Sequence, residues 1–483
     1  MAHFVWLLAD QGVSFASGSD ASGYLNCARL IDRGEFSTPI RPVSGLQGRG
    51  WAGNYQQPLG FAVQPGTGHL IPTYPIGLPL HLLAAAKLVG WQHSAILVNI
   101  LTALAIGLLM LALGRYACGL DWAWVLASVA VFWACPLFLF VSFQPLSDAL
   151  AATWTLAALA AAWGSRRHWT WALAAGAAVG MAVLVRPTNL LVVAPVAVLL
   201  GLGWRRWLAL GLGGLPFASA LAFFNLHTYG QIFTTGYGDI DSLVQAKFVP
   251  HNAAHFAAWI VGLLTPFVLL ALGLPWLARR QPRLVSAFSL WVAALVGFYL
   301  FYYHSGETWW YLRFILPVFP IFILSAAMVA QRGTALVASA AWRGALVAFV
   351  VLFVLDCQFI VGRRLNITNV SAHDYAYFNA VHWLRVNAPA NAVMVAMQAS
   401  GALHYYTSFP LIRYDLMDAR MFAHACAVAK ANGQPMYAPL FPSEIEPVVG
   451  ARLGGDWQKI ATIDFITIWR LESGETATAR PHA

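Results

Sequence analysis

The connectors between the apolar segments of this chain divide its charges into two sets. On one side the connectors are short and rich in arginine, at 114–115, 165–168, 204–206, 278–283 and 331–333. The opposite connectors hold most of the acidic residues, among them Asp20, Asp32, Glu35, Asp148, Asp241 and Glu307, and Asp121 is the clear exception. Short cytoplasmic loops of membrane proteins are enriched in Lys and Arg. The alternation therefore predicts a chain that crosses a membrane many times, with its carboxylates on the outer face.

Composition agrees with a membrane protein and excludes other classes. Of the 483 residues, 59% are hydrophobic and only 10% are charged, which is too apolar for a soluble enzyme of this length. The formal net charge of +9 does not indicate nucleic-acid binding, because the arginines lie in short loops where the positive-inside effect explains them. The five cysteines have neither metal-ligand spacing nor a paired pattern.

Ten apolar segments are predicted to span the membrane, near 93–114, 122–143, 147–164, 169–185, 188–204, 207–227, 256–278, 284–303, 311–330 and 344–362. The apolar run at 3–9 is too short to span and lacks the flanks of a signal peptide, so it is either the remainder of a first helix or a short stub. The predicted fold class is an all-α polytopic membrane protein, with about ten or eleven transmembrane helices and a small C-terminal α/β domain.

Two domains are predicted. Residues 1–362 form the transmembrane domain, which includes a long first outer loop at 10–92, and residues 363–483 form the outer α/β domain. Within the loop, 19–33 has the apolar spacing of an amphipathic surface helix. The Gly- and Pro-rich stretch 35–70 is predicted to be an irregular, mobile loop, and 75–90 an interfacial or re-entrant segment.

The C-terminal part of the chain has a different pattern from the apolar segments. An amphipathic helix is predicted at 373–387, where Ala388-Pro389 ends it. Strands are predicted at 391–397, 409–413 and 460–471, and the last residues, 473–483, are predicted to be disordered. Helices that alternate with short strands favour a small α/β domain on the outer face.

Two acidic residues on outer segments are candidates for catalysis. Asp20 opens the predicted surface helix, where a carboxylate either caps the helix or accepts a proton from an acceptor hydroxyl. Asp148 lies at the outer end of an otherwise uncharged helix, where a carboxylate is costly unless it is functional or paired; a capping role with Ser147 is the alternative.

Two arginines near the outer face are candidates for binding an anion. Arg186 departs from the positive-inside trend, and its guanidinium suits bidentate phosphate binding, although snorkelling toward lipid headgroups is an alternative. Arg313 requires a counter-ion, for which Glu307 is a candidate. His227, Tyr229, His251, His255 and His304 are polar groups on outer segments without a recognisable ligand spacing.

The order of these parts resembles the GT-C fold of glycosyltransferases that use polyprenyl-phosphate sugars, such as the protein O-mannosyltransferases and the aminoarabinose transferase of lipid A. The resemblance covers almost the whole chain and rests on the order of its motifs. The matching segments are 18–24 with Arg29, 74–80, 147–148, 185–189, 311–314 with Pro317 and Pro320, 383–385 and 404–406. Many members carry an Asp-Glu pair in the first loop, whereas here Ala21 follows Asp20.

The resemblance implies an inverting transfer of a sugar from a polyprenyl-phosphate donor to a lipid, glycan or protein acceptor. It places the protein in a bacterial inner membrane, with the active site and the C-terminus facing the periplasm. Asp20 and Asp148 would be catalytic, with Asp20 acting as a base or orienting the acceptor and Arg186 binding the lipid phosphate. The substrate-binding candidates are Tyr24, Arg186, Arg313, Glu307, His227 and Tyr229.

The resemblance leaves several points open. It does not decide whether a divalent metal ion is required, and it names no nucleic-acid partner. Two other functions remain as alternatives: a transporter or flippase of lipid-linked sugars, and a non-catalytic protein of envelope assembly. The scarcity of charge inside the spans and the lack of an obvious internal repeat count against transport.

Overall fold

The computed structural model describes residues 2–46, 53–64, 66–236, 241–277, 279–450 and 453–472, and the predicted disordered tail at 473–483 lies outside these ranges. The chain forms two compact units. The membrane unit comprises Met1–Gly12, Pro75–Phe223 and Tyr237–Val370, and the α/β unit comprises Val13–Tyr74, Phe224–Gly236 and Ser371–Ala483. Most of the first loop thus folds with the C-terminal part of the chain. The sequence-based boundary at 362/363 stays a prediction.

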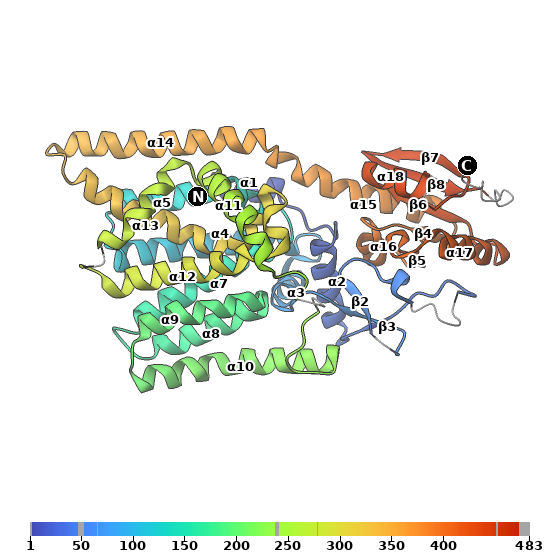
Figure 1. Ribbon diagram of the computed structural model, residues 1–483, viewed down its shortest axis with the longest axis horizontal. Coiled ribbons are helices and arrows are strands. Elements are labelled where there is room, and N and C mark those ends of the chain that lie inside the picture. Colours follow the sequence, from blue (N-terminus) through green and yellow to red (C-terminus); the bar gives the residue numbers. More distant parts are fainter. Residues whose placement is uncertain are drawn as a thin grey trace. The chain divides into compact units, whose positions relative to one another are not determined.

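The membrane unit is almost entirely helical (Figure 1). Its α-helices are α1 (Ala2–Gln11), α3 (Gly77–Val89), α4 (Ser94–Ala112), α5 (Trp122–Trp133), α6 (Pro136–Ser142), α7 (Asp148–Gly164), α8 (Trp171–Val185), α9 (Val193–Leu200), α10 (Trp204–Tyr229), α11 (Val249–Leu264), α12 (Pro282–Leu300), α13 (Phe319–Thr334) and α14 (Ala340–Arg364). A π-helical turn, η2 (Leu113–Ala117), extends α4. The 3-10 segments are η3 (Pro187–Val192), η4 (Ala246–Phe248), η5 (Pro266–Leu277), η6 (Tyr303–Gly306), η7 (Trp309–Val318) and η8 (Ile367–Asn369).

Among the described residues, five helices are long and apolar enough to cross a membrane: Ser94–Ala117, Trp204–Tyr229, Pro282–Leu300, Trp309–Thr334 and Ala340–Arg364. Two bent pairs raise the number to seven if each pair is one span. These pairs are Trp122–Trp133 with Pro136–Ser142, bent by 58°, and Ala246–Leu264 with Pro266–Leu277, bent by 106°. The protein is therefore a multi-pass membrane protein, and the number of ten or eleven spans stays a prediction.

The second bend changes one predicted segment. The sequence predicts a single span at 256–278, but the helix ends at Leu264 and Thr265 adopts a left-handed conformation, with φ of 62°. Pro266 then begins the 3-10 segment η5. A residue that precedes proline is disfavoured in the α-helical region, which favours the end of the α-helix before Thr265.

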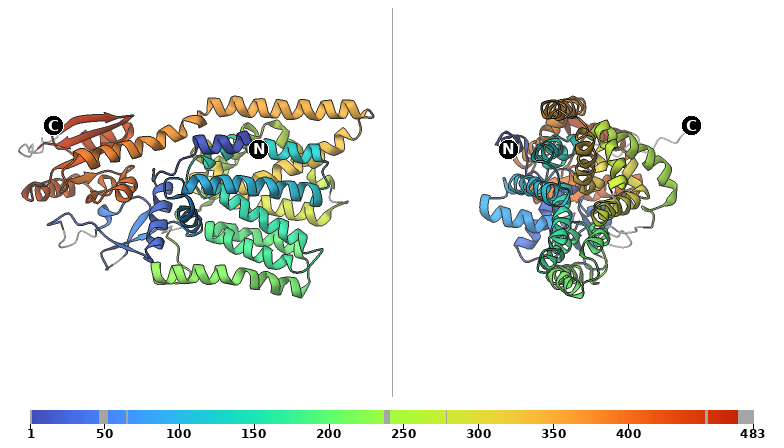
Figure 2. Two further views of the ribbon diagram at one scale, coloured as in Figure 1. Left: turned by 180° about the vertical axis from the view of Figure 1, so that it is seen from behind. Right: turned by 90° about the vertical axis from the view of Figure 1, so that its left-hand side faces the viewer.

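Small residues bring the helices of the membrane unit into close contact. A side chain at Gly176 of α8 would collide with the backbone of Leu210 in α10, and one at Gly213 of α10 would collide with Leu173 in α8. Such contacts between small residues are typical of helix packing in membranes. By contrast, α10 and α14 lie at the outside of the helical unit (Figure 2), and they are the least buried of the spanning helices. Their exposed Leu, Phe and Trp side chains suit contact with lipid.

The first loop forms a helix and a small sheet in the α/β unit. Helix α2 (Asp20–Asp32) confirms the predicted surface helix. The stretch predicted to be irregular instead contains β1 (Thr38–Pro39), the 3-10 turn η1 (Gly53–Gln56), β2 (Phe61–Gln64) and β3 (His69–Pro72); residues 47–52 and 65 of it lie outside the described ranges. The three strands form an antiparallel sheet in the order β1-β3-β2. They are too short for periodicity to reveal.

A second, five-stranded sheet has the order β5-β4-β6-β8-β7. Its strands are β4 (Val393–Val395), β5 (Leu411–Ile412), β6 (Met436–Leu440), β7 (Trp457–Ile463) and β8 (Ile466–Leu471). Strands β5, β4 and β6 are parallel, whereas β8 and β7 run antiparallel. The segment predicted as one strand at 460–471 is a hairpin, because Asp464 takes the left-handed conformation of a turn.

Helices cover both faces of this sheet. Helix α15 (Val370–Asn387) confirms the predicted helix and packs on one face with α16 (Ser400–Tyr406). Helix α17 (Ala419–Ala431) covers the other face together with Val43, Leu46 and Tyr55 of the first loop. The remaining elements are the turn η9 (Tyr414–Leu416) and helix α18 (Pro442–Val449). The predicted small α/β domain thus has first-loop side chains within its core.

Candidate active site

A buried carboxylate in the membrane unit is shared by two guanidinium groups. Asp148 is the first residue of α7 and is fully buried. Its Oδ1 lies 2.7 Å from Nη2 of Arg186, and its Oδ2 lies 3.9 Å from Nη1 of Arg313. Both arginine side chains are 11% exposed. Two predicted cations and one predicted anion therefore meet at one place, which we call the Arg–Asp–Arg cluster.

The local sequence explains how Arg186 reaches this position. Pro187 follows it, and a residue before proline is driven out of the helical region, so α8 ends at Val185 and Arg186 is extended, with φ of −151° and ψ of 120°. Its Nε then donates to Ser147 Oγ at 3.0 Å. A side chain at Gly77 would collide with the backbone of Val185. Gly77 therefore lets the start of α3 touch the end of α8 directly before Arg186.

Aromatic rings line the Arg–Asp–Arg cluster. The guanidinium carbons of Arg186 and Arg313 each lie 5.4 Å from the centre of the Phe314 ring. The ring of Phe314 is itself stacked with those of Tyr299, at 5.3 Å, and Tyr311, at 5.5 Å. Cation–π contacts of this kind favour a guanidinium that has lost part of its water.

The cluster has the groups needed to bind an anion. It contains two guanidinium groups, and within a poorly hydrated site a cationic group interacts strongly with an incoming anion. Guanidinium groups donate paired hydrogen bonds in the geometry that phosphate accepts. The carboxylate of Asp148 lowers the cost of burying both cations together.

Glu307 is not the counter-ion of Arg313 that the sequence suggested. Glu307 instead pairs with Nδ1 of His304 at 3.0 Å, and both side chains are partly exposed. Asp148 takes the expected place of Glu307 because α7 packs against η7, which carries Arg313. His251 and His255 contact the carbonyl oxygens of Gly306 and Thr308.

Asp20, the other predicted catalytic residue, belongs to the α/β unit. It is the first residue of α2, and the N-cap position is occupied by Ser19, whose side chain makes no capping hydrogen bond. The hydroxyl of Tyr74 donates to Asp20 Oδ1 at 2.6 Å. Ser19 Oγ lies 2.8 Å from the same hydroxyl, and because Tyr74 gives its only proton to Asp20, Ser19 is the donor. The ring of Tyr24 lies 4.9 Å from that of Tyr74.

Tyr74 keeps its proton over the whole physiological range. Burial, and then the charge of Asp20, raise the pKa of Tyr74 well above its ordinary value of 10. Its hydroxyl therefore remains a donor that fixes the Asp20 carboxylate. Sequence reasoning assigned no role to Tyr74, because the residue lies 54 positions from Asp20 and no periodic pattern links the two.

The last turns of α10, from Phe224 on, belong to the α/β unit, and with them His227 and Tyr229. The ring of His227 is 5.3 Å from that of Phe36, and the hydroxyl of Tyr229 donates to the carbonyl oxygen of Pro72 at 2.9 Å. Tyr229 thereby holds strand β3 two residues before Tyr74. Within the ranges that the structure describes, no three His, Cys, Asp or Glu side chains gather in a way that could hold a metal ion.

Comparison with protein-family models and with curated proteins finds no match for this sequence. Comparison with solved structures finds similar folds. ArnT from Cupriavidus metallidurans bound to undecaprenyl phosphate matches with a TM-score of 0.60 and 15% identity, over 98% of this chain and 97% of that one. Arabinofuranosyltransferase AftD from mycobacteria matches with a TM-score of 0.54 and 13% identity, over 98% of this chain and 41% of that one.

A third similar structure is the oligosaccharyltransferase AglB from Archaeoglobus fulgidus, in complex with an inhibitory peptide and a dolichol-phosphate. It matches with a TM-score of 0.51 and 13% identity, over 89% of this chain and 66% of that one. All three are glycosyltransferases with the GT-C fold. The order of spans, first loop and α/β domain in this chain is therefore that of a multi-pass membrane protein with the GT-C fold.

Proposed function

We propose that this protein is an inverting glycosyltransferase that moves a sugar from a polyprenyl-phosphate donor to an acceptor hydroxyl. The observation that carries the proposal is the Arg–Asp–Arg cluster, in which two buried guanidinium groups share one carboxylate. Solved relatives of the fold were captured with undecaprenyl phosphate or dolichol-phosphate, which supports a lipid phosphate as the ligand.

In the proposed reaction the acceptor oxygen attacks the anomeric carbon from the face opposite the phosphate. The bond between the anomeric carbon and the phosphate oxygen breaks, and the polyprenyl phosphate leaves with the bonding electron pair. Because this phosphate is a stable anion, its departure requires no general acid. Arg186 and Arg313 stabilise the charge that grows on the leaving phosphate, while Asp148 keeps the two guanidinium groups together.

The proton of the acceptor hydroxyl requires a base or an orienting anion. We assign this role to Asp20, which accepts the hydrogen bond of Tyr74 and is thereby held in one orientation. Tyr24, His227 and Tyr229 of the same unit are proposed to contact the acceptor or the sugar, and Glu307 of the membrane unit is proposed to contact the donor. We place the protein in a bacterial inner membrane with both groups of residues on the periplasmic side.

The proposal is tested by binding of undecaprenyl phosphate to the purified protein in detergent. We expect Arg186→Ala to weaken binding about tenfold to a hundredfold, because charge-assisted hydrogen bonds to a phosphate are lost. Arg186→Lys should weaken it less, because the charge remains and only the paired geometry is lost. Arg205→Ala, which alters an exposed arginine at the start of α10, is the matched control. Unchanged affinity in Arg186→Ala would favour the snorkelling alternative.

A turnover assay distinguishes sugar transfer from the two alternatives, transport of the lipid-linked sugar and a non-catalytic role in assembly. Wild-type protein should transfer a radiolabelled sugar from a polyprenyl-phosphate donor to an acceptor. Movement of the labelled donor across proteoliposomes without transfer would identify a transporter. Donor binding without transfer or transport would identify a non-catalytic assembly protein.

A further inference from the structure

Helix α16 contacts the first loop along its whole length. Ser400 Oγ accepts the backbone N–H of Leu59 at 3.0 Å, and the carbonyl oxygen of Gly401 accepts Asn26 Nδ2 at 3.2 Å. The carbonyl oxygen of His404 accepts Arg41 Nη2 at 2.8 Å. The last two residues contribute their side chains: Arg29 lies 4.0 Å above the ring of Tyr405, and the hydroxyl of Tyr406 accepts the N–H of Ala16 at 3.1 Å.

The closest contact lies next to Asp20. A methyl group added at Gly401 would collide with the side chain of Ser22, two residues after Asp20 in α2. A side chain at Gly23 would collide with the ring of Tyr74, and one at Gly60 would collide with the backbone of Gly23. Gly60 also has a φ of +86° that favours glycine. The first turns of α2 are thus held between the start of α16 and the Leu59-Gly60 turn.

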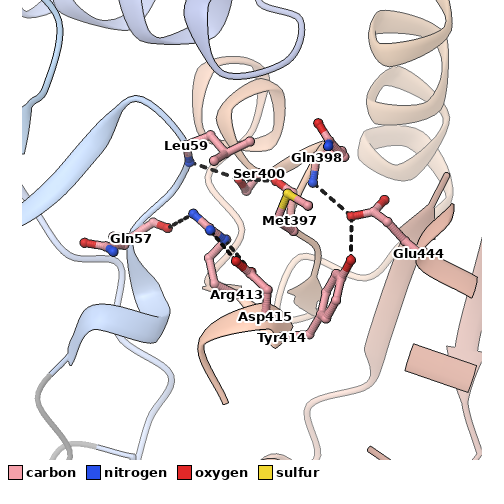
Figure 3. Close-up of polar contacts among 9 residues, drawn as sticks. All are labelled: Gln57, Leu59, Met397, Gln398, Ser400, Arg413, Tyr414, Asp415 and Glu444. Atoms are coloured by element: carbon pink, nitrogen blue, oxygen red, sulfur yellow. Dashed lines mark hydrogen bonds and ion pairs between the residues drawn. The ribbon is translucent and has the colours of Figure 1, made fainter. Parts of the chain in front are cut away.

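The segment that leads into this turn, residues 55–59, lies at the carboxyl ends of the parallel strands (Figure 3). The backbone N–H of Arg413, directly after β5, donates to Tyr55 O at 2.6 Å, and its Nη1 donates to Gln57 O at 3.4 Å. The carboxylate of Asp415 accepts hydrogen bonds from the other two guanidinium nitrogens of Arg413, Nε at 2.7 Å and Nη2 at 2.5 Å. This edge is where open α/β sheets commonly bind their ligands. Here a segment of the chain itself, residues 55–59, lies there.

A buried carboxylate completes this edge. Glu444, which follows β6 and is 1% exposed, accepts the N–H groups of Gln398 and Phe441 at 3.0 Å each and the hydroxyl of Tyr414 at 3.1 Å. Burial raises its pKa, while these hydrogen bonds act in the opposite direction. Glu444 thereby connects the loop before α16 to the turn after β5, where Arg413 contacts the first loop.

We propose that α16 is a positioning element that fixes the Asp20 carboxylate through α2, with the contact of Gly401 and Ser22 as its central point. The inference rests on the role proposed above for Asp20. Residues of α16 touch no reacting atom in this scheme; they hold the helix whose first residue reacts. The C-terminal α/β domain therefore serves the transfer reaction by orienting a residue of the first loop.

The proposal is tested by introducing a steric clash between α16 and α2 and then removing it with a second substitution. Gly401→Ala should press against Ser22, tilt α2 and lower kcat on the order of tenfold, because small displacements of a reacting group are costly. Affinity for undecaprenyl phosphate should stay at the wild-type value, because Arg186 and Arg313 belong to the membrane unit. Adding Ser22→Gly removes the two nearest obstructing atoms and leaves the carbonyl oxygen of Leu59, at 3.1 Å from the added methyl, as the next nearest, so the double variant should regain most of the lost kcat relative to Ser22→Gly alone.

Hydrogen exchange of the full-length protein gives a readout that does not depend on activity. Amide protection of residues 22–28 should fall in Gly401→Ala and return in the double variant. Gly344→Ala, at a helical glycine with nothing within 4 Å of an added methyl, is the matched control and should behave as wild type. Wild-type kcat in Gly401→Ala, a loss without change in α2 protection, or a loss that Ser22→Gly does not relieve would each overturn the proposal. If the wild-type protein transfers no sugar, the proposed function fails, and the exchange measurement alone decides whether α16 holds α2.

Discussion

Nη2 of Arg186 lies 2.7 Å from Oδ1 of Asp148, at a place where the carboxylate has no contact with solvent. The carboxylate also faces Arg313, so one acidic residue pairs with two arginines. We propose that Asp148 reduces the repulsion between these two cations, whether or not it also takes part in proton transfer.

Replacing Asp148 by Asn should therefore reduce stability as well as activity. Loss of one partner from a buried ion pair typically costs about 3–5 kcal/mol, because the remaining charge stays buried without compensation. We expect a lower thermal transition in detergent and a loss of transfer. Asp121→Asn, which alters an exposed acid before α5, is the matched control. An unchanged transition temperature in Asp148→Asn would show that Asp148 does not stabilise the two arginines.

Asp20→Asn should leave folding near normal and reduce turnover by on the order of a hundredfold or more, because the amide keeps the shape of the side chain but cannot accept the acceptor proton. Asp32→Asn, at the other end of the same helix, is the control. Turnover and thermal stability should be measured on both variants and on Asp20→Ala. Full activity in Asp20→Asn would move the catalytic assignment to Asp148.

Tyr74→Phe removes the hydroxyl that donates to Asp20 and accepts from Ser19. We expect a loss of about 1 kcal/mol in stability and a drop in kcat, because the carboxylate loses the group that orients it. Since the pKa of Tyr74 is raised well above 10, Tyr74 itself should add no step to the pH–rate profile below about pH 10. Tyr375→Phe, at an exposed tyrosine of α15, is the reference. A wild-type kcat in Tyr74→Phe would remove Tyr74 from the site.

The stability of the α/β unit should depend on pH through Asp374. This residue of α15 is 4% exposed, and burial raises its pKa from 3.8 to about 7, with a hydrogen bond from Ser17 acting in the opposite direction. Because the pKa of Asp374 is higher in the folded than in the unfolded state, the stability that its protonated carboxyl contributes is fully present below about pH 4. This contribution to the free energy of unfolding is lost as the pH rises to about 7, by about 4 kcal/mol in total.

Asp374→Asn does not titrate and should therefore be more stable than wild type near pH 8, with the difference vanishing near pH 4. Urea unfolding of the α/β unit within the full chain, followed by hydrogen exchange at both pH values, measures this difference. Burial and the charges of Arg41 and Arg33 lower the pKa of His404 to about 3, so protonation of His404 destabilises both proteins on acidification. Its effect cancels in the comparison. A difference that does not change with pH would contradict the assignment.

The C-terminus should lie on the periplasmic side. The motivation is the distribution of arginine among the connectors, which a reversed orientation would not preserve. An alkaline phosphatase reporter fused after Ala483, active only in the periplasm, should be active. A reporter fused after Arg332, within an arginine-bearing connector, should be inactive and serves as the control. The opposite pair of results would reverse the proposed orientation and the side on which transfer takes place.

Sequence reasoning identified Asp148, Arg186 and Arg313 singly but not as one cluster. Each stood out because charge is costly inside an apolar segment, and that argument applies to one residue at a time. Partners were then chosen by nearness in the sequence, which is why Glu307 was paired with Arg313. The contact of η7 with α7 determines the actual partner, and packing between distant helices leaves no local signal.

The two sheets of the α/β unit show the same limit. Helices α2 and α15 were predicted because their apolar residues recur with the helical period. Strand β6 was missed because it contains Pro439, which sequence rules exclude from central strands. The insertion of Val43, Leu46 and Tyr55 into the core of the C-terminal sheet could not be predicted, because these residues lie in a stretch rich in Gly and Pro without any period.

The joint core of residues from both ends of the chain also constrains the order of events during synthesis. The ribosome delivers residues 13–74 before almost all of the spanning helices, but their partners in α15–α17 and β4–β8 emerge last. Throughout the insertion of the spans, α2 has its contacts with the first loop but lacks those with α16. The helix that carries Asp20 is therefore completed only when translation has reached the final strands, so a prematurely terminated chain lacks a finished α/β unit even when all its spans are in place.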